Sequence, residues 1–560
     1  MIKDNKIKII SKALLTLAMM MFASHIVICQ DINKEVTVVK AYKPEVKDAT
    51  KINQMPEFND TLAVVPNFEY SISSVRLNTP FAPRPVSAAK MLADPLTSLH
   101  TSYLKLGYGN YFTPLAELDI SSQRMKENSF EIFLKHQSAD GKVILDNGNE
   151  IVAPYANNTA TIWGKHILKK SILYGSAGYF SNKTAFYGYN TSNQNIDISN
   201  INTGDSLQTY QGGSFTLGLE SLETDSTKLY YNLKSCFDFV GDKFSHSENH
   251  LSLAGLTGKQ TGEFYFGTEA YYDYYSSANA IDSGYNTIFK IRPYLSKSKG
   301  NWRFLLGFDG VNDNTLSGST FHNYLRANLE FIVVPSVLYT FFGYDGFLEK
   351  NSLLSVSQIN PYIIPGLNVK NADHKTHIFG GLKGNFSSDV QIMAQASYSE
   401  VNNQSFYIND TISKLANKFL VLYDNIELLK FSAELDFRSS KNIIITAKAD
   451  YSIYSMTKLP EPWQMPGFES TISARYSLRD KIILTADLYV LGSRYARNPL
   501  TGGVIKLNPF ADFNLGAEYR YTKILSLFIQ FKNLTATKYV FWNQYPLYGF
   551  QVMGGFTYAL

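Results

Sequence analysis

The sequence predicts an all-β fold, a large closed antiparallel transmembrane barrel of about 22 strands preceded by a short N-terminal segment. Apolar and polar residues alternate over long stretches, and tight turns alternate with long loops. The composition also fits: 38 Tyr and 37 Phe occur among 560 residues, 18% of the residues are charged, and the mean hydropathy is -0.14. A wall with one apolar and one polar face has such a composition, whereas a bundle of membrane-spanning helices is more apolar.

The alternation has the period of two that is typical of a β-strand. Between Ile443 and Ile453, for example, apolar or small residues occupy one face while Lys448 and Asp450 lie on the other. A soluble sandwich alternates too, so strand length has to decide between the two folds. Many runs last about 10 to 13 residues, which is what a tilted strand needs to cross a bilayer and about twice the usual globular strand. Strand length therefore favours a membrane barrel.

The connections predict which ends of the strands face the periplasm. Short turns on one side and long loops on the other are typical of outer-membrane barrels. We expect short turns at 124–128, 168–171, 223–227, 258–261, 297–301, 386–389, 438–442 and 477–481, and long loops at 137–156, 181–211, 348–373, 402–426 and 491–509. The last strand should end at Leu560 and pair with the first strand near Thr101 to close the barrel. Trp542, Tyr545 and Tyr548 are expected in an interfacial aromatic girdle.

Residues 1–29 predict a signal peptide. Four lysines precede or open an apolar run from Ala13 to Ile28, and cleavage after Cys29 would leave Gln30 as the first mature residue. A lipidated Cys29 is the alternative, although Ile28 stands where a small residue is usual. After cleavage the exported chain would keep a single cysteine, Cys236, and would therefore have no internal disulfide.

The net charge excludes nucleic acid as a partner. The signal contains four Lys and one Asp, a charge of +3, so the formal +4 of the whole chain becomes +1 in the mature protein. Such a chain has no strongly basic field to attract phosphates.

Residues 30–100 form a separate segment, and residues 101–560 form the barrel. Seven prolines and little alternation predict an extended segment that fills the lumen or reaches into the periplasm. The stretch Glu35, Val36, Thr37, Val38 and Val39 is the exception, because it alternates and could add a strand to the sheet edge of a partner. A minor strand in the lumen, or an ordinary linker, is the other interpretation.

Two stretches resemble TonB-dependent receptors of the type common in Bacteroidetes-like bacteria. Residues 35–42, EVTVVKAY, are similar to the acidic-led box to which the inner-membrane energy-coupling protein binds. The closing hairpin, from Asn533-Leu534-Thr535 through Lys538-Tyr539 to Gly549-Phe550 and the last strand, is similar to the terminal hairpin of those receptors. The resemblance implies a 22-stranded barrel filled by a plug of well over a hundred residues. Here about seventy residues precede the barrel and the arginine-glycine and aspartate-glycine motifs of a full plug are missing, so the plug is expected to be shortened or absent.

Candidate site residues are few, and no cofactor or catalytic group is indicated. His246, Glu248 and His250 alternate, so a strand would turn all three to one side and they could bind a metal, although polar residues are common at such a loop junction. No G-x-S-x-G elbow or grouped nucleophile and base is present. The charged residues expected to face the lumen either line a substrate path or pair across it; they are Lys105, Glu117, Asp119, Glu131, Lys135, Glu434, Asp436, Lys448, Asp450, Asp487, Glu518 and Arg520.

Two functions are open at this point. The first is a receptor-like outer-membrane protein that binds or passes a solute, with outer-membrane lipid and an energy-coupling protein as partners. The second is a plug-less structural subunit of a larger outer-membrane assembly or secretion complex, which would bring a surface lipoprotein or other barrel proteins as partners.

Overall fold

The computed structural model describes residues 101–122, 127–191, 207–222, 225–278, 284–367, 369–411, 413, 415–439 and 442–560. The described residues all belong to the unit Asp94–Leu560. The signal at 1–29, the segment 30–100 and the stretch Glu35–Val39 therefore lie outside the described residues.

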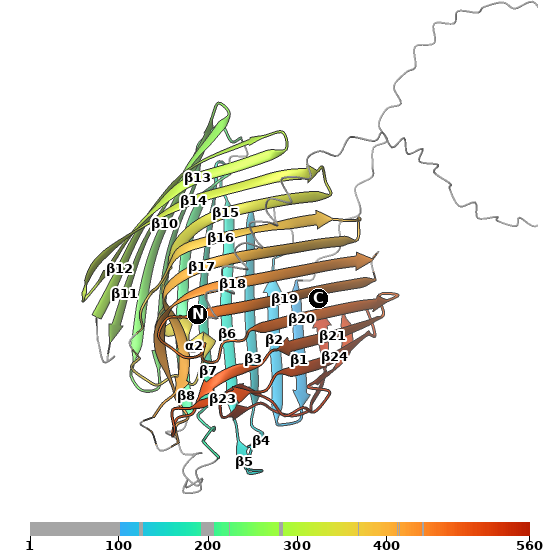
Figure 1. Ribbon diagram of the computed structural model, residues 1–560. Helices are drawn as coiled ribbons and strands as arrows, with labels where there is room; N and C mark the ends of the chain where they lie inside the picture. Colours follow the sequence, from blue (N-terminus) through green and yellow to red (C-terminus); the bar gives the residue numbers. More distant parts are fainter. Residues whose placement is uncertain are drawn as a thin grey trace, which may run out of the picture. The chain divides into compact units, whose positions relative to one another are not determined.

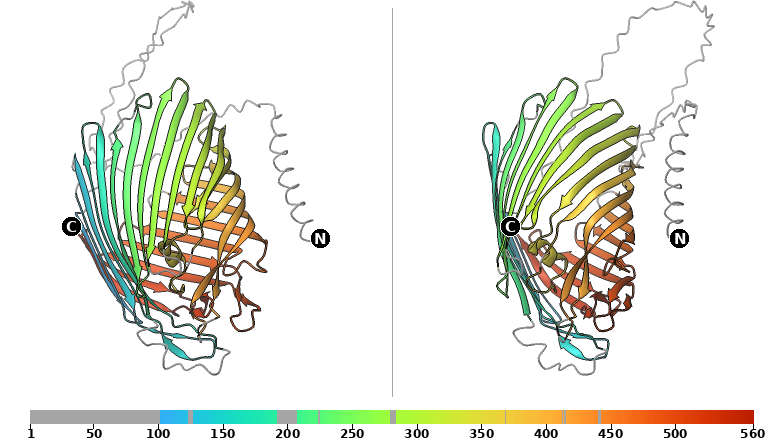
Figure 2. Two further views of the ribbon diagram at one scale, coloured as in Figure 1. Left: turned by 90° about the vertical axis from the view of Figure 1, so that its left-hand side faces the viewer. Right: turned by 60° about the vertical axis from the view of Figure 1, so that its left-hand side comes forward.

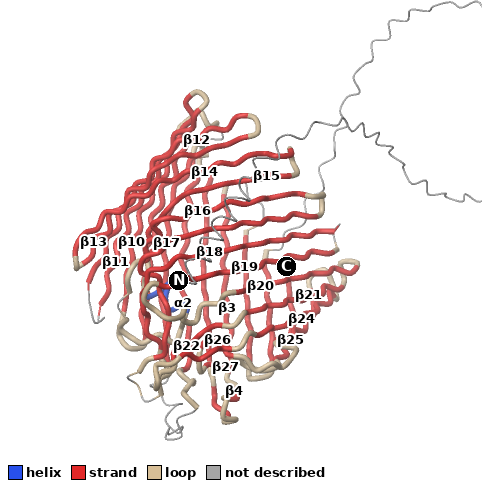
Figure 3. Tube along the Cα trace, in the orientation of Figure 1, coloured by secondary structure: helices blue, strands red, loops and turns tan. Residues whose placement is uncertain are grey.

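The described unit is a single closed sheet of 22 strands (Figure 1). Its strands are β1 (Ser102–Gly109), β2 (Thr113–Ser121), β3 (Asn128–Ala139), β6 (Tyr155–Ile167), β7 (Ser171–Ala185), β8 (Leu207–Ser221), β9 (Tyr230–Asp242), β10 (Ser247–Thr261), β11 (Phe264–Ala278), β12 (Gly284–Lys299), β13 (Trp302–Thr315), β14 (Gly318–Val334), β15 (Leu338–Glu349), β16 (Ala372–Asn385), β17 (Val390–Asn409), β18 (Phe419–Ser439), β19 (Ile443–Met456), β20 (Phe468–Leu478), β21 (Ile482–Leu491), β24 (Phe510–Arg520), β25 (Leu525–Lys532) and β28 (Gln551–Ala559). Strand dominates the described chain, and the short helix α2 (Leu353–Ile359) is its only helix (Figure 3).

The first and last strands close the barrel. Each barrel strand pairs antiparallel with its neighbours, and β1 pairs with β28 from Tyr103 opposite Ala559 to Gly109 opposite Met553. The ladder therefore has no free edge, and the predicted closure and strand number are confirmed. Among the described residues no helix has the length and apolarity to cross a membrane.

The outer face of the wall is apolar and the inner face is polar. On β14, Phe321, Leu325 and Leu329 are 66%, 58% and 47% exposed, while Tyr324 and Arg326 on the other face are 4% and 9% exposed. Exposed apolar side chains of this kind need a lipid environment, because a soluble protein buries such a surface. The predicted alternation is thus the alternation between lipid and lumen.

One predicted turn is wrong. The sequence predicts a turn at 258–261, but β10 continues to Thr261 and the chain turns at Gly262, whose φ is 62°. Gly258 instead makes room for an aromatic ring of the next strand, since a Cβ there would lie 2.1 Å from the Tyr265 hydroxyl. A glycine in a strand often marks such a close approach rather than a turn.

The wall varies in height around the barrel (Figure 2). β1 and β25, near the closure, have 8 residues each, whereas β17 and β18 have 20 and 21. At about 3.4 Å per residue, the former are about 27 Å long and the latter about 70 Å long. The long strands continue into the predicted loop 402–426 and extend well beyond an apolar belt of about 25 Å. They bring the loop between them to the outer mouth.

We predict that a side chain at Gly555 destabilises the pairing of β1 with β28, which closes the barrel. A Cβ there would meet the Leu106 carbonyl oxygen at 2.0 Å and the Gly107 Cα at 2.7 Å, both of them backbone atoms. Gly555→Ala should lower the free energy of unfolding by about 1–3 kcal/mol, the usual cost of overpacking, measured by urea unfolding in detergent. Gly164→Ala is the matched control, because its Cβ would find its nearest neighbour at 3.6 Å. Equal unfolding midpoints for the two variants would contradict the prediction.

Candidate functional site

Five loops fold together over the outer mouth of the barrel. Their described residues are 140–154, which contain β4 (Lys142–Ile144) and β5 (Glu150–Val152); 186–191; 350–367 and 369–371, which contain α2; 410–411, 413 and 415–418; and 533–550, which contain β26 (Val540–Trp542) and β27 (Tyr545–Pro546). We call these five loops the lid. All of them leave from the end of the barrel opposite the short turns, which in an outer-membrane barrel is the cell exterior.

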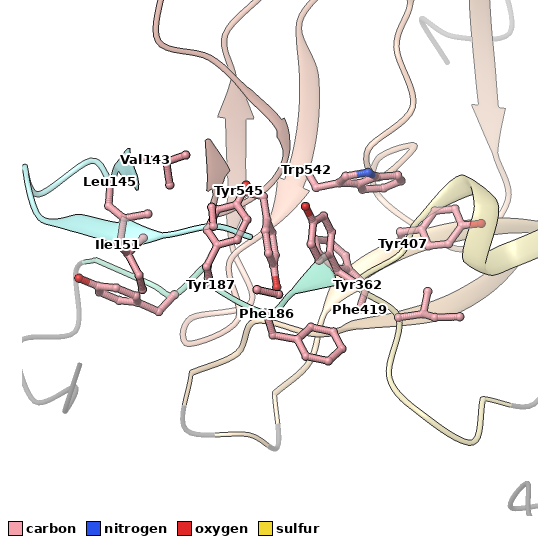
Figure 4. Close-up of a cluster of buried hydrophobic side chains, with 14 of the residues drawn as sticks. Val143, Leu145, Ile151, Phe186, Tyr187, Tyr362, Tyr407, Phe419, Trp542 and Tyr545 are labelled. Atoms are coloured by element: carbon pink, nitrogen blue, oxygen red, sulfur yellow. The ribbon is translucent and has the colours of Figure 1, made fainter. Parts of the chain in front are cut away.

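The lid has its own hydrophobic core (Figure 4). Tyr545 lies at its centre and is 1% exposed. The Tyr545 ring stacks on Tyr362, with the centroids 3.7 Å apart, and meets the edge of Tyr187 at 5.0 Å. Around it pack the other buried members of the core, Ala139, Val143, Leu145, Ile151, Ala153, Ala185, Phe186, Tyr189, Tyr210, Val356, Ile363, Tyr407, Phe419, Val421, Trp542 and Tyr548. The lid is therefore folded structure and not a set of separate solvated loops.

The buried polar groups of this core are largely paired between loops. The Tyr187 hydroxyl donates to the Pro546 carbonyl at 2.8 Å, and the Tyr548 hydroxyl donates to the Ala153 carbonyl at 2.6 Å. The Asn417 side-chain amide donates to the Phe186 carbonyl at 2.8 Å, and Tyr545 donates to the Asn417 carbonyl. Such bonds hold the loops in one arrangement, because a loop that moves leaves a buried group unpaired.

The lid bridges opposite walls of the barrel. Phe186 follows β7, and Asn417 lies between β17 and β18. Eight strands, β9 to β16, separate these two places in one direction, and ten strands separate them in the other, from β19 through β28 and β1 to β6. Loops that start about half a circumference apart touch each other, so the lid spans the mouth.

The structure corrects the expected place of Trp542, Tyr545 and Tyr548. They are 8%, 1% and 8% exposed and belong to the lid core, so they are not in a lipid-facing girdle. Their closeness to the last strand suggested the girdle, but the loop 533–550 turns inward over the mouth. Three further residues of the lid core, Phe186, Tyr187 and Tyr189, are not among the site residues predicted from the sequence. Three aromatic residues within four positions of an expected long loop are the signal that would have found them, since solvated loops seldom contain so many.

Beside the lid core lies a second buried cluster, which contains Trp463 from the loop between β19 and β20. The hairpin of β22 (Arg494–Arg497) and β23 (Val504–Leu507) packs next to it. Arg494 is 2% exposed and donates to the carbonyls of Val540, at 2.7 Å, and of Phe541 in the lid. Burial lowers the pKa of the Arg494 guanidinium to about 10. The contact fixes the hairpin to the lid.

The proposed metal ligands point to separate partners. His250 lies between Asp238 and Asp273, with both nitrogen-to-oxygen distances 3.1 Å. Glu248 accepts the backbone N–H of Leu353, at the start of α2, at 3.2 Å. His246 Nδ1 lies 3.3 Å from an oxygen of Asp242, the last residue of β9. The described residues contain no group of three or more ligands that could hold a metal, so His246, Glu248 and His250 do not converge here.

The charged residues expected in the lumen form short rows across neighbouring strands. Lys105 is opposite Glu117, and Glu117 is opposite Lys135, which binds it at 2.8 Å. Lys448 binds Glu434 at 3.4 Å and Asp450 binds Lys430 at 3.4 Å. Asp119 on β2, Asp487 on β21, and Glu518 and Arg520 on β24 carry further charge along the same part of the sheet. That these residues line a substrate path stays a prediction.

A denser network covers the wall of β11 to β14. Arg292 binds Asp309 at 2.8 Å and Glu269 at 3.1 Å. Arg326 lies over the Tyr294 ring, 3.6 Å from Glu269 and 3.8 Å from Asp309. Two cations and two carboxylates balance each other within this network.

Comparison with known proteins identifies the fold. No protein-family model and no curated protein matches the sequence. The pyoverdine outer-membrane receptor FpvA from Pseudomonas aeruginosa, solved with pyoverdine, is 11% identical with a TM-score of 0.62, over 83% of this chain and 79% of that one. The FrpB iron transporter from Neisseria meningitidis is 10% identical with a TM-score of 0.63, over 83% and 82%. The ferric-catecholate import receptor Fiu from E. coli K12 is 9% identical with a TM-score of 0.61, over 83% and 82%.

The chain has the barrel fold of TonB-dependent outer-membrane receptors. Together with the apolar outer face, this fold makes it an outer-membrane β-barrel. The similar structures are described as receptors and transporters rather than enzymes.

We predict that alkaline pH loosens the lid. Burial raises the pKa of Tyr545 and Tyr187 well above 10 and that of Tyr548 to about 12. In an open lid these groups ionise near 10, so the closed lid holds their protons more tightly. Their contribution to closure is complete below pH 10 and is lost as the pH rises through about 12. A tyrosinate absorbance titration should show some tyrosines that ionise above pH 10, and it should show fewer of them in Tyr548→Phe. Tryptophan fluorescence should change over the same pH range. Titration of all tyrosines near pH 10 would contradict this.

Proposed function

We propose that this protein binds or passes a solute across the outer membrane and that the lid gates its passage at the cell exterior. The observation that supports the proposal is the bridge between opposite walls, in which the Asn417 amide binds the Phe186 carbonyl within the lid core. A lumen enclosed by 22 strands is wide enough for a channel or a plug. A barrel of this size must be obstructed, or it leaks.

The lid sets the energy that a ligand has to supply. Each buried aromatic side chain contributes about 1.5–3 kcal/mol to the closed arrangement, so a lid with several such residues opens rarely by itself. A ligand shifts this equilibrium only by as much as it binds the open lid better than the closed lid. The outer loops would thus serve both as the obstruction and as the element that recognises the solute.

The similar structures support solute passage as the class of function. FrpB is described as an iron transporter, Fiu as an import receptor, and OprC as a copper transporter. At 9–11% identity these likenesses show the fold, and the solute is not carried over.

Energy coupling belongs to the proposal as well. We assign Glu35, Val36, Thr37, Val38 and Val39 to strand addition on a TonB-type energy-coupling protein, because the stretch alternates and has two valines on one face. A force that the energy-coupling protein exerts on this stretch would act on a segment of about seventy residues rather than on a full plug.

A structural subunit is the second candidate, and exposed apolar side chains favour it. Ile144 at the β4–β5 hairpin is 53% exposed, and Leu500 and Val504 in the loop before β24 are 61% and 52% exposed. These residues stand on outer loops, where lipid does not cover them, and such a surface suits a protein partner. Affinity purification from outer membranes tests this candidate: a stoichiometric companion that is lost from Ile144→Asp and Val504→Asp favours the subunit.

We predict that opening the lid makes the barrel leaky. Tyr545→Ala removes the central ring of the lid and should weaken it by about 3–5 kcal/mol, the usual effect of truncating a buried aromatic residue. Proteoliposomes with this variant should swell several times faster in a neutral sugar than those with the original chain. Tyr521→Ala is the matched control, because Tyr521 is 62% exposed at a short turn of the other end. Equal swelling rates for Tyr545→Ala and the original chain would show that the lid does not gate the barrel.

We also predict that deletion of residues 35–39 abolishes growth that depends on the imported solute and leaves the protein in the outer membrane. The deletion removes the strand-adding stretch without touching the barrel. Growth on limiting nutrients and the amount of protein in the membrane fraction are the two measurements. Unchanged growth together with a general fall in outer-membrane proteins would reject energised import and favour the structural subunit.

A further inference from the structure

Two residues of the lid hold a backbone conformation that side chains disfavour. Ala416, in the loop between β17 and β18, has a φ of 49°, and Gln544, in the turn between β26 and β27, has a φ of 72°. Both values lie in the left-handed region, where a Cβ crowds the backbone and glycine is the usual residue. Asparagine and aspartate also tolerate this region, but neither residue is one of these. The closed lid therefore contains backbone strain at two places.

One side chain contacts both strained residues. The side-chain nitrogen of Asn409, at the end of β17, donates to the Ala416 carbonyl at 3.0 Å and to Gln544 Oε1 at 3.4 Å. The side-chain oxygen of Asn409 accepts a bond of 2.7 Å from the Asn543 amide. Because Asn409 is 2% exposed, these bonds are shielded from water. The two strained positions thus belong to one contact between two loops of the lid.

Further contacts hold these two loops together and join them to a third. The Tyr545 hydroxyl donates to the Asn417 carbonyl, and the Asn417 amide donates to the Phe186 carbonyl at 2.8 Å. Gly188, two residues after Phe186, approaches the β26–β27 turn so closely that a Cβ there would lie 2.6 Å from the Gln544 carbonyl oxygen. We call the group that joins the first two loops the clasp; its members are Asn409, Ala416, Asn417, Asn543, Gln544 and Tyr545.

We propose that the clasp is a strained catch, which keeps in the closed lid part of the free energy needed to open it. The proposal rests on the proposed function, because it concerns how the lid opens. A strained backbone persists only where surrounding contacts over-determine it, and here the contacts are the amide bonds of Asn409 and Asn417. When the loops separate, the backbones of Ala416 and Gln544 relax. A solute that competes for one of these bonds then has less free energy to supply.

The rate of lid opening can be measured through Cys236, the one cysteine that the mature chain is predicted to keep. Cys236 lies on the inner face of β9, since Phe237 and Phe239 are each 39% exposed on the opposite, lipid-facing side. In intact cells, a charged thiol reagent too large for general porins reaches Cys236 only through the mouth of the barrel. Cys236→Ser gives the background. Tyr545→Ala should be labelled faster than the original chain, because its lid is weakened.

Removing the strain should slow the labelling of Cys236. Gln544→Gly should be labelled about two- to fivefold more slowly than Gln544→Ala, since both variants lack the amide side chain and only Gln544→Ala keeps the strain. Ala416→Gly should be slowed by a similar factor relative to the original chain. Ser336→Gly is the matched control and should be labelled as the original chain is, because Ser336 has a φ of 63° in the turn between β14 and β15, at the other end of the barrel.

Crowding the clasp should have the opposite effect. Gly188→Ala places a Cβ against the Gln544 carbonyl oxygen and should speed labelling about tenfold. Gly549→Ala, also in the lid, is the control for this variant, because the atom nearest to its Cβ would be the Tyr111 hydroxyl at 3.5 Å.

The outcomes separate the strained clasp from the gate itself. If Gln544→Gly is labelled as fast as Gln544→Ala, and Ala416→Gly as fast as the original chain, while Tyr545→Ala still opens the lid, the strained clasp is overturned and the gate stands. Labelling of Tyr545→Ala at the rate of the original chain would reject the gate and the clasp with it. Migration of the unheated protein on gels, which reports on the folded barrel, shows that each variant has folded.

Discussion

The structure depends on one constraint, which is that backbone N–H and C=O groups within lipid must find partners inside the protein. An open sheet leaves an edge unpaired, and each unpaired group costs several kcal/mol in hydrocarbon. Here the pairing of β1 with β28, which begins with Tyr103 opposite Ala559, leaves no edge unpaired. Gly107 and Gly555 lie opposite each other where the two ends of the barrel meet, and a Cβ at Gly555 would meet backbone atoms of β1.

Closing a sheet of 22 strands creates a second problem, since the interior is too wide for side chains to fill. In this chain the outer loops address it. Long strands on one wall, β17 and β18, bring their connection close to the loop that follows β7 on the opposite wall. The resulting lid core is built like the interior of a small soluble domain, with stacked rings and hydroxyls that bond to carbonyls. Arg494 joins the β22–β23 hairpin to this core through the carbonyls of Val540 and Phe541.

On the inner wall, pairing between charged side chains lowers the free-energy cost of placing them there. Several charged residues that face each other across neighbouring strands are of opposite sign, as Glu117 and Lys135 are, and Arg292 binds both Asp309 and Glu269. His250 lies between two aspartates in the same manner. Pairing of this kind holds the shape of a wet lumen, and it uses up the side chains that alternation alone offered as metal ligands.

The sequence by itself determined the barrel. A period of two, runs long enough to cross a bilayer, and the alternation of turns and loops each report on a single strand or its neighbour, and these local features also predicted the number of strands and their closure. The tertiary structure decided where the loops go. Trp542, Tyr545 and Tyr548 are indistinguishable from girdle residues in the sequence, and Arg494 is an ordinary loop arginine there. Their roles arise because segments more than a hundred residues apart meet over the mouth, as Tyr545 meets Asn417, and a pattern within one segment contains no information about such a meeting.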